Sequence, residues 1–332
     1  MAVEEFKLNS IFENKLFINS LKKERSTELT NIPNTNKEYL FQDDLLNAIL
    51  LYLSYPIQDA LYLSGPTGCG KTSAVIEVAA RLNWPLIQTT LSNKSDINDL
   101  IGHMVVKNGS VEFEYGPLVN AMQSGAILLI NEIDMVSAGD LSILNDVVEG
   151  RDLIITANKG EIIKAHSNFR IIATANTQGN GDFEGIYHGC VLQNHAFLDR
   201  WRYFNCAYLS EEKERLLLRK IFPEIKKTLE NKLVQFSTEL RTVIVGNPQD
   251  KNRISSLDTP FSTRTLVKIA KLLHKFNDIS PWQAIYIMYA ARLWKDEQEY
   301  VKRLTLDIFG YTDDESKKKA RRKTIKLQNN PS

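Results

Sequence analysis

Five short segments in the first two thirds of the chain are rich in apolar residues and lead into polar ones. They cover residues 60–64, 85–90, 126–131, 169–175 and 203–207. Apolar runs of this length are typical of parallel strands that are buried on both faces of a sheet. Segments with helical periodicity lie between them. The pattern therefore predicts a three-layer α/β domain built on a parallel five-stranded sheet.

The segments between the strands carry helix signals. Residues 116–124 begin with Pro117 at the first helical position and stop at Gly125, as helices commonly do. Such signals predict helices over residues 43–55, 73–82, 95–102, 116–124 and 141–149. Two further segments are expected to be inserted between core elements. One is a polar insertion over residues 105–113, and the other is a hairpin over 153–163 that turns at residues 158–160.

From residue 210 onward the pattern is helical, with no intervening strand. Helices are predicted over residues 211–221, 225–244, 263–276 and 281–295, with a last one ending near residue 310. This arrangement indicates a small helical lid domain. The expected boundaries are an N-terminal extension at 1–40, the α/β domain at 41–209, the lid at 210–310 and a basic, flexible tail at 311–332.

The two ends of the chain are less informative. The apolar residues of the extension fit a helical stripe, either as a clasp onto the domain or as an arm that docks a partner. That stripe consists of Phe6, Leu8, Ile11, Phe12, Leu16, Phe17, Ile18 and Leu21. The basic run at residues 317–323 is compatible with a solvated end or with an anionic partner such as nucleic acid.

Composition excludes several classes of protein. The chain has 332 residues and a formal net charge of +1, so its overall charge points to no polyanionic partner. Its three cysteines have neither paired nor metal-ligand spacing, which suits a reducing compartment. The first residues do not resemble a signal peptide, and no apolar run approaches the roughly 20 residues of a membrane-spanning helix. We expect a cytoplasmic protein without a membrane partner.

The strongest motif follows the first strand. Gly65, Gly70, Lys71 and Thr72 fit the pattern G-x-x-x-x-G-K-[ST] between a predicted strand and a helix. Backbone N–H groups of such a loop surround the phosphates of ATP, and the helix N-terminus adds partial positive charge. Lys71 would reach the β- and γ-phosphates, and the Thr72 hydroxyl would ligate Mg²⁺. The expected nucleotide-binding residues are Gly65, Pro66, Thr67, Gly68, Cys69, Gly70, Lys71, Thr72 and Ser73.

Two further strand ends carry candidate catalytic groups. The strand at residues 126–131 ends in Asn131-Glu132, where ATP-hydrolysing phosphate-loop proteins place Asp-Glu. Glu132 occupies the position of the base that activates water, and Asn131 replaces the acid that helps to hold Mg²⁺. Asn176 ends the next strand and could orient the attacking water. The alternative roles are a solvated acid for Glu132 and a turn-capping amide for Asn176.

These motifs together resemble the AAA+ ATPases of the MoxR-type branch. That branch shares the Leu-Ile-Gly, Gly-Pro-Leu and Gly pattern found here at residues 100–102, 116–118 and 125. Four runs narrow the match to the small ATPase subunit of aerobic cobaltochelatase. They lie at residues 81–85, 173–177, 185–189 and 198–201. The resemblance extends from about residue 41 to about residue 310.

The resemblance implies roles that the residues alone do not. Arg200 corresponds to an arginine finger that acts on ATP bound in a neighbouring subunit, although an ion-paired surface arginine is the alternative. Arg264 corresponds to a second sensor on the lid, and Asn176 to the first sensor. Asn131 departs from the family, which puts the strength of metal binding in doubt. The resemblance also implies a ring, expected to be a hexamer, and a partner with a von Willebrand A-type domain.

The sequence thus predicts a Mg²⁺- and ATP-dependent ring ATPase that remodels a partner protein. Catalysis is expected to involve Glu132, Asn176, Arg200 and Arg264, with Thr72 and Asn131 at the metal. One alternative is a phage or host ATPase that remodels a protein or nucleoprotein complex unrelated to metal chelation. Another is a nucleotide-gated scaffold with little hydrolysis, which Asn131 keeps open.

Overall fold

The chain folds into two compact units in a computed structural model, residues 1–207 and 208–332. The structure describes residues 3–24, 30–182, 187–245, 257, 259–276 and 278–310. The predicted basic tail at 311–332 lies outside the described residues. Among the described helices, none is both long enough and apolar enough to cross a membrane.

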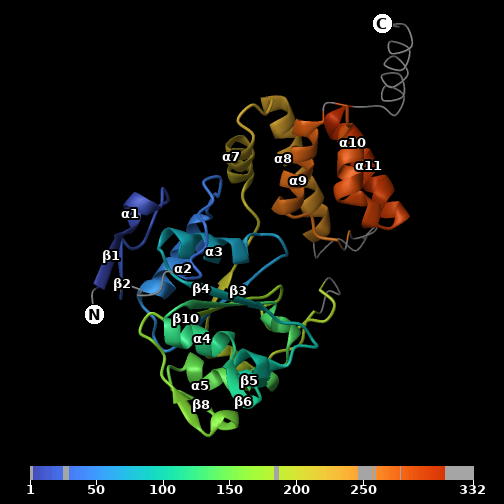
Figure 1. Cartoon of the computed structure of the whole chain (residues 1–332). Helices are drawn as coiled ribbons and strands as arrows, with labels where there is room; N and C mark the ends of the chain where they lie inside the picture. The colour runs from blue at the N-terminus through green and yellow to red at the C-terminus, as the bar shows by residue number, and fades with distance from the viewer. Residues whose placement is uncertain are drawn as a thin grey trace, which may run out of the picture. The chain divides into compact units, whose positions relative to one another are not determined.

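A parallel five-stranded sheet forms the centre of the first unit, so the predicted α/β fold is confirmed (Figure 1). Its strand order is β11-β3-β10-β7-β4. The strands are β3 (Ala60–Ser64), β4 (Leu86–Thr90), β7 (Ile127–Asn131), β10 (Arg170–Thr174) and β11 (Trp201–Asn205). Every residue of β3 and β7 is buried, as expected of central strands covered on both faces.

Helices cover both faces of this sheet. Figure 1 shows α2 (Asp43–Ser54) and α3 (Lys71–Arg81) on one face and α4 (Pro117–Ser124) and α5 (Asn145–Val148) on the other. The residues expected to begin and end α4 do so in the structure. Pro117 occupies its first position, and Gly125 ends it in the left-handed conformation.

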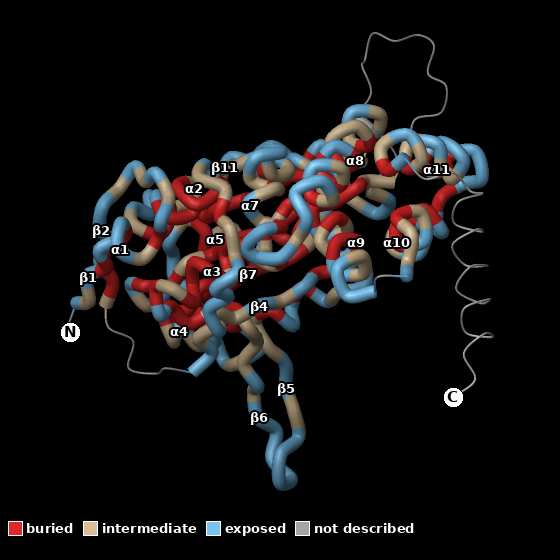
Figure 2. The backbone as a smooth tube through the Cα atoms, turned by 90° about the horizontal axis from the view of Figure 1, so that it is seen from above, coloured by how far each residue is buried: buried red, intermediate tan, exposed pale blue. Residues whose placement is uncertain are grey.

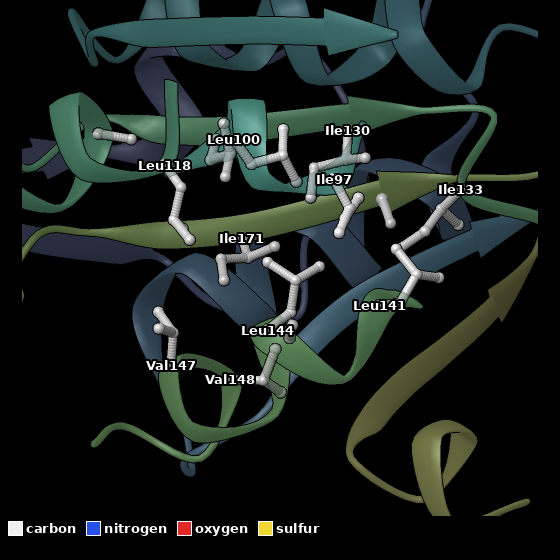
Figure 3. Packing of buried hydrophobic residues seen from close by; sticks show 14 of the residues in the cluster. Ile97, Leu100, Leu118, Ile130, Ile133, Leu141, Leu144, Val147, Val148 and Ile171 are labelled. Carbon is white, nitrogen blue, oxygen red and sulfur yellow. The ribbon is translucent and has the colours of Figure 1, made fainter. Parts of the chain in front are cut away.

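The face beneath α4 and α5 contains the larger core. Alternate residues of β7 and β10, among them Ile130 and Ile171, point into it. Figure 3 shows Leu144, Val147 and Val148 packing towards Ile171. The same alternation sends the other strand residues to the opposite face, so each strand contributes to two apolar layers.

The N-terminal segment is not the predicted helical stripe. Residues Val3–Lys7 (β1) and Ser20–Glu24 (β2) form an antiparallel hairpin, and only Leu8–Ile11 (α1) is helical. Cross-strand charges explain this outcome, because the register places Glu4 opposite Lys23 and Glu5 opposite Lys22. The spacing of apolar residues alone could not reveal that pairing.

Lys23 also anchors this hairpin to the first unit. Its side chain is buried, and its ammonium lies 5.3 Å from the ring of Phe6 and 5.9 Å from the ring of Trp84. Asn168 accepts a hydrogen bond from the Glu24 N–H and donates one to the Glu24 carbonyl. The extension is thus packed onto the α/β domain over its described residues.

The predicted polar insertion is an ordered hairpin rather than an irregular segment. Gly102–Lys107 (β5) pairs with Ser110–Tyr115 (β6) and projects from the body of the unit (Figure 2). The second hairpin was predicted correctly, and it consists of Leu153–Ile155 (β8) and Glu161–Ile163 (β9). Both hairpins expose apolar side chains, including Val106 and Val111 on the first and Ile154 and Ile162 on the second.

Three predicted helices are shorter or more broken than expected. The segment 95–102 contains only the 3₁₀ turn Ile97–Leu100, which is capped by Asp96. The segment 141–149 divides into a 3₁₀ turn, Asp140–Leu144, and α5. The segment 281–295 breaks after α10 (Pro281–Met288), where a 3₁₀ turn, Ala290–Arg292, follows. Local propensity did not reveal these breaks.

The second unit is helical over its described residues. It contains α7 (Glu211–Ile221), α8 (Lys227–Val245), α9 (Thr263–Lys275), α10 and α11 (Lys295–Phe309). Edge-to-face aromatic packing marks its core, since the ring of Phe261 contacts those of Phe236 and Tyr289.

A buried ionic network joins three helices of this unit. Glu214 on α7 accepts hydrogen bonds from Arg241 on α8 at 2.8 Å and from Thr263 on α9 at 2.7 Å. Ser237 donates to its second oxygen. Because the carboxylate is almost fully buried, removing it leaves the guanidinium without its partner.

We therefore expect Glu214→Ala to lower the free energy of unfolding of this unit by about 3 kcal/mol. Glu211→Ala is the matched control on the same helix, because Glu211 forms an exposed pair with Arg215 and should cost less than about 0.5 kcal/mol. Urea denaturation followed by far-ultraviolet circular dichroism measures both. Equal losses would mean that the buried network does not stabilise the unit.

Candidate functional site

Three strands of the central sheet end together at one edge. The phosphate-loop sequence follows β3, Glu132 follows β7, and Asn176 lies two residues beyond β10. Since β3 lies between β11 and β10, the order of the sheet reverses beside it. Open α/β sheets bind ligands at such a point, outside the carboxyl ends of the strands.

Glycine is required in the loop after β3. Gly65 and Gly70 have φ angles of 137° and 106°, which L-residues with a Cβ rarely adopt. A Cβ on Gly65 would also lie 2.2 Å from the carbonyl oxygen of Cys206. Gly70 provides the residue before α3, so the backbone turns directly into the helix N-terminus. This is the geometry of an anion-binding loop.

Lys71 is buried within this loop. Its ammonium donates hydrogen bonds to the carbonyl of Gly65 at 2.5 Å and to that of Pro66 at 3.1 Å. The cation therefore lies beside the first peptides of the loop, where it can meet a polyphosphate. Gln42 connects the phosphate loop to the segment after β11, because its side-chain amide donates hydrogen bonds to the carbonyls of Cys69 and Ala207.

Asn131 is buried, and both the oxygen and the nitrogen of its side chain form hydrogen bonds. Its side-chain oxygen accepts hydrogen bonds from the hydroxyl of Thr72 at 2.7 Å and from that of Thr174 at 3.2 Å. Its amide nitrogen donates to the carbonyl of Thr89 at 3.1 Å. That carbonyl can only accept, so it fixes the orientation of the amide. The Thr72 proton is directed at Asn131, which leaves the lone pairs of the hydroxyl oxygen for a cation.

Glu132 has a strained backbone. Its φ of 56° and ψ of 42° are left-handed values that are rare for a residue of this size. This conformation follows the end of β7 and presents the carboxylate to Asn176, whose amide donates to it at 2.6 Å. Burial and the nearby Asp134 raise the pKa of Glu132, while Lys71 and the Asn176 hydrogen bond oppose the shift.

Asp134 organises the loop that follows β10. One of its oxygens accepts the backbone N–H groups of Asn176 and Thr177 and the Thr177 hydroxyl. Its own carbonyl accepts the N–H of Val191 at 2.7 Å. Burial and the Asp134 carboxylate raise the pKa of Cys190 to about 12. This carboxylate oxygen thus fixes the backbone at the start of the loop.

Tyr187 reaches the phosphate loop from that same segment. Its hydroxyl oxygen accepts the backbone N–H of Thr67 at 3.3 Å. Tyr187 belongs to the run at residues 185–189 that contributes to the family resemblance. Gly185 and Ile186 of that motif lie outside the described residues. Folding brings Tyr187 to a loop that is more than a hundred residues away in sequence.

Two cysteines also meet at the phosphate loop. The thiol of Cys206, just beyond β11, lies beside that of Cys69 and lowers the pKa of Cys69, with Lys71 contributing. The contact with Cys69 and burial raise the pKa of Cys206. The spacing of the cysteines along the chain gave no sign of this pair.

Arg200 lies away from this cluster within the first unit. Arg200 precedes β11, where its carbonyl pairs with Ala60 at the start of β3, and its guanidinium donates to Glu149 at 2.5 Å and to the carbonyl of Ala196. Arg200 therefore lies at the amino-terminal ends of the strands, whereas the phosphate loop lies at their carboxyl-terminal ends. Arg264 is exposed in the first turn of α9, in the second unit.

The structure thus brings together Lys71, Thr72, Asn131, Glu132 and Asn176. Sequence reasoning missed the contributions of Gln42, Asp134 and Tyr187 to this site. The local signals at these positions were weak, because a glutamine before a helix and an acid after a strand are common. Their roles depend on partners that are distant in sequence.

Comparison with known proteins agrees with this geometry. Residues 60–185 match the family model for the AAA domain of the dynein-related subfamily, and residues 215–305 match the CbbQ/NirQ/NorQ C-terminal model. The chain is 31% identical over 258 residues to the aerobic cobaltochelatase subunit CobS of Sinorhizobium sp., covering 75% of each protein. It is also 30% identical over 188 residues to an uncharacterised protein of Staphylococcus haemolyticus, covering 55% of this chain and 68% of that protein.

The phosphate loop, the glutamate after β7 and the asparagine after β10 lie within the first matched region. The second matched region covers most of the helices of the second unit. The chain therefore belongs to the MoxR-type AAA+ ATPases, the group of ATP hydrolases to which the cobaltochelatase subunit CobS is related.

Proposed function

We propose that the protein is a Mg²⁺- and ATP-dependent ring ATPase that remodels a partner protein. The observation that carries the proposal is the contact of Glu132 with Asn176 beside Lys71 and the phosphate loop. A carboxylate held by an amide next to a polyphosphate site is suited to activating and orienting water. Its raised pKa brings the base closer to neutral pH, where proton transfer is more effective.

The residues present fit a divalent cation bound with ATP. Thr72 would hold the metal directly, because its proton is donated to Asn131 and its oxygen is left to coordinate. A bound Mg²⁺ would supply charge neutralisation for the transferred phosphoryl group. Asn131 supports Thr72 but brings no negative charge, so the nucleotide-gated scaffold with little hydrolysis is retained as a second candidate.

Oligomerisation is supported by the position of Arg200. Arg200 lies near the start of β3, and the phosphate loop follows its end. Because β3 has five residues with a rise of about 3.3 Å each, the two ends of the strand are roughly 13 Å apart. Arg200 thus serves a phosphate only in a neighbouring subunit. We propose a ring, expected to be a hexamer, in which Glu149 holds the finger until the neighbour binds ATP. Arg264 is proposed as the second sensor on a lid formed by residues 210–310.

The partner is proposed from the relatives and from the two hairpins. The related CobS is named as a cobaltochelatase subunit, so a chelatase partner with a von Willebrand A-type domain is one candidate. The exposed apolar residues of β5–β6 and β8–β9 offer a contact surface. A phage or host assembly unrelated to chelation remains the alternative, and the genes next to this one would separate the two.

A trapping experiment tests this function. Glu132→Gln removes the base but keeps the shape, so we expect ATP binding to persist while hydrolysis falls by roughly 10²–10⁴-fold. This variant should retain the partner in a pull-down with ATP. Lys71→Ala is the control, because loss of the ammonium should abolish both ATP binding and partner retention. An unchanged ATP affinity in Lys71→Ala would refute the site.

Subunit mixing tests the role of Arg200. Arg200→Ala should bind ATP normally and lose hydrolysis by roughly 10³-fold or more. Adding Lys71→Ala subunits should restore part of the activity at mixed interfaces, measured as phosphate release. Arg151→Ala is the matched control, since exposed Arg151 pairs with the same Glu149 and should leave hydrolysis unchanged. Failure of rescue in verified rings would exclude a finger in trans.

Replacing Asn131 with the aspartate that is usual at this position tests its role at the metal site. We expect Asn131→Asp to lower the Mg²⁺ concentration for half-maximal ATPase activity and to raise basal turnover, because it adds negative charge beside Thr72. A carboxylate oxygen would also face the Thr89 carbonyl, so the melting temperature in chelator should fall and recover with Mg²⁺. An unchanged Mg²⁺ titration would place Asn131 away from the metal. Hydrolysis by this variant alone, with none by the wild type and its partner, would favour the scaffold.

A further inference from the structure

Tyr187 places a hydroxyl group on the phosphate loop from outside that loop. Its oxygen accepts the Thr67 N–H, and Thr67 itself is exposed at the surface of the loop. None of the residues that the sequence singled out for nucleotide binding supplies this group. The contact therefore adds a polar atom to the site that neither the loop motif nor the strand ends account for.

The hydroxyl keeps a proton to donate. A tyrosine oxygen can accept hydrogen bonds and donate one, and Thr67 uses only an acceptor position. Among the described residues, none accepts a hydrogen bond from the Tyr187 O–H group. Burial raises the pKa of Tyr187 above its usual value, so the group stays protonated at neutral pH.

The position of this donor points to the terminal phosphate. Thr67 directly follows Gly65 and Pro66, whose carbonyls hold the Lys71 ammonium. A lysine at this position of the motif reaches the β- and γ-phosphates. The segment that carries Tyr187 begins at Asn176, which contacts Glu132. Tyr187 thus approaches the loop from the side on which hydrolysis is expected.

The backbone around Tyr187 is held in place. Its N–H donates to the Asp182 carboxylate at 2.8 Å, and its carbonyl accepts the Cys190 N–H at 3.2 Å. Val191 is bonded in turn to the buried Asp134. A donor fixed before the ligand arrives contributes more to affinity, because less conformational freedom is lost on binding.

We propose that Tyr187 is a phosphate-contacting residue that distinguishes nucleoside triphosphate from diphosphate. Its hydroxyl oxygen accepts a hydrogen bond from the Thr67 N–H, and its O–H group donates a hydrogen bond to an oxygen of the terminal phosphate. This inference rests on the proposed function, because it requires ATP in the phosphate loop. It assigns part of the discrimination between ATP and ADP to a side chain outside the phosphate loop and the recognised strand ends.

Calorimetric titration of Tyr187→Phe with ADP and with the non-hydrolysable analogue adenylyl imidodiphosphate tests the proposal. Loss of one hydrogen bond to a charged phosphate should weaken binding of the analogue about tenfold and change ADP affinity less than twofold. Tyr55→Phe makes the same chemical change at an exposed, remote position and should alter neither affinity. Thermal unfolding verifies that each variant is folded.

The outcomes separate this inference from the proposed function. If the wild type binds both nucleotides and Tyr187→Phe changes neither affinity, the inference fails and the function stands. Equal losses for both nucleotides would mean that the hydroxyl only orders the loop, which also overturns the inference. If the wild type binds neither nucleotide, both proposals fail.

Discussion

A single oxygen atom joins the ends of the central strands. The side-chain carbonyl of Asn131, at the end of β7, accepts hydrogen bonds from Thr72 of the phosphate loop and from Thr174 at the end of β10. Because this oxygen is buried, both hydroxyls are held in one orientation. The relative positions of the phosphate loop, Glu132 and Asn176 depend on this junction. An asparagine can make it without the charge that an aspartate would bring.

The two acids that follow β7, Glu132 and Asp134, differ in burial and in their hydrogen-bond partners. Glu132 is only partly buried, has a strained backbone and faces Asn176, so it remains available to a substrate. Asp134 is fully buried, and one of its oxygens accepts the backbone N–H groups of Asn176 and Thr177. Burial and hydrogen bonding therefore separate an accessible carboxylate from a structural one over three positions of the chain. The strain at Glu132 is the kind that functional sites store.

The same segment connects the strand ends to the phosphate loop. Asp134 fixes Asn176 and Val191, and Tyr187 between them reaches Thr67. The contacts of Tyr187 and Asp134 thus connect the phosphate loop to the segment that holds Asn176 beside Glu132. A conformational change at either end can affect the other through these contacts. The β5–β6 hairpin projects from the body of the unit (Figure 2), and both hairpins expose apolar side chains.

The sequence alone determined the sheet, the phosphate loop and the positions of Glu132 and Asn176, because apolar runs and glycine positions are local consequences of burial and backbone geometry. It did not determine the N-terminal hairpin, where pairing of Glu4 with Lys23 overrode an apparent helical period. Nor did it reveal the contacts of Tyr187 with Thr67, of Gln42 with Cys69 or of Cys69 with Cys206. Each of these joins residues that are distant along the chain, and only the packing of the tertiary structure decides which distant groups meet.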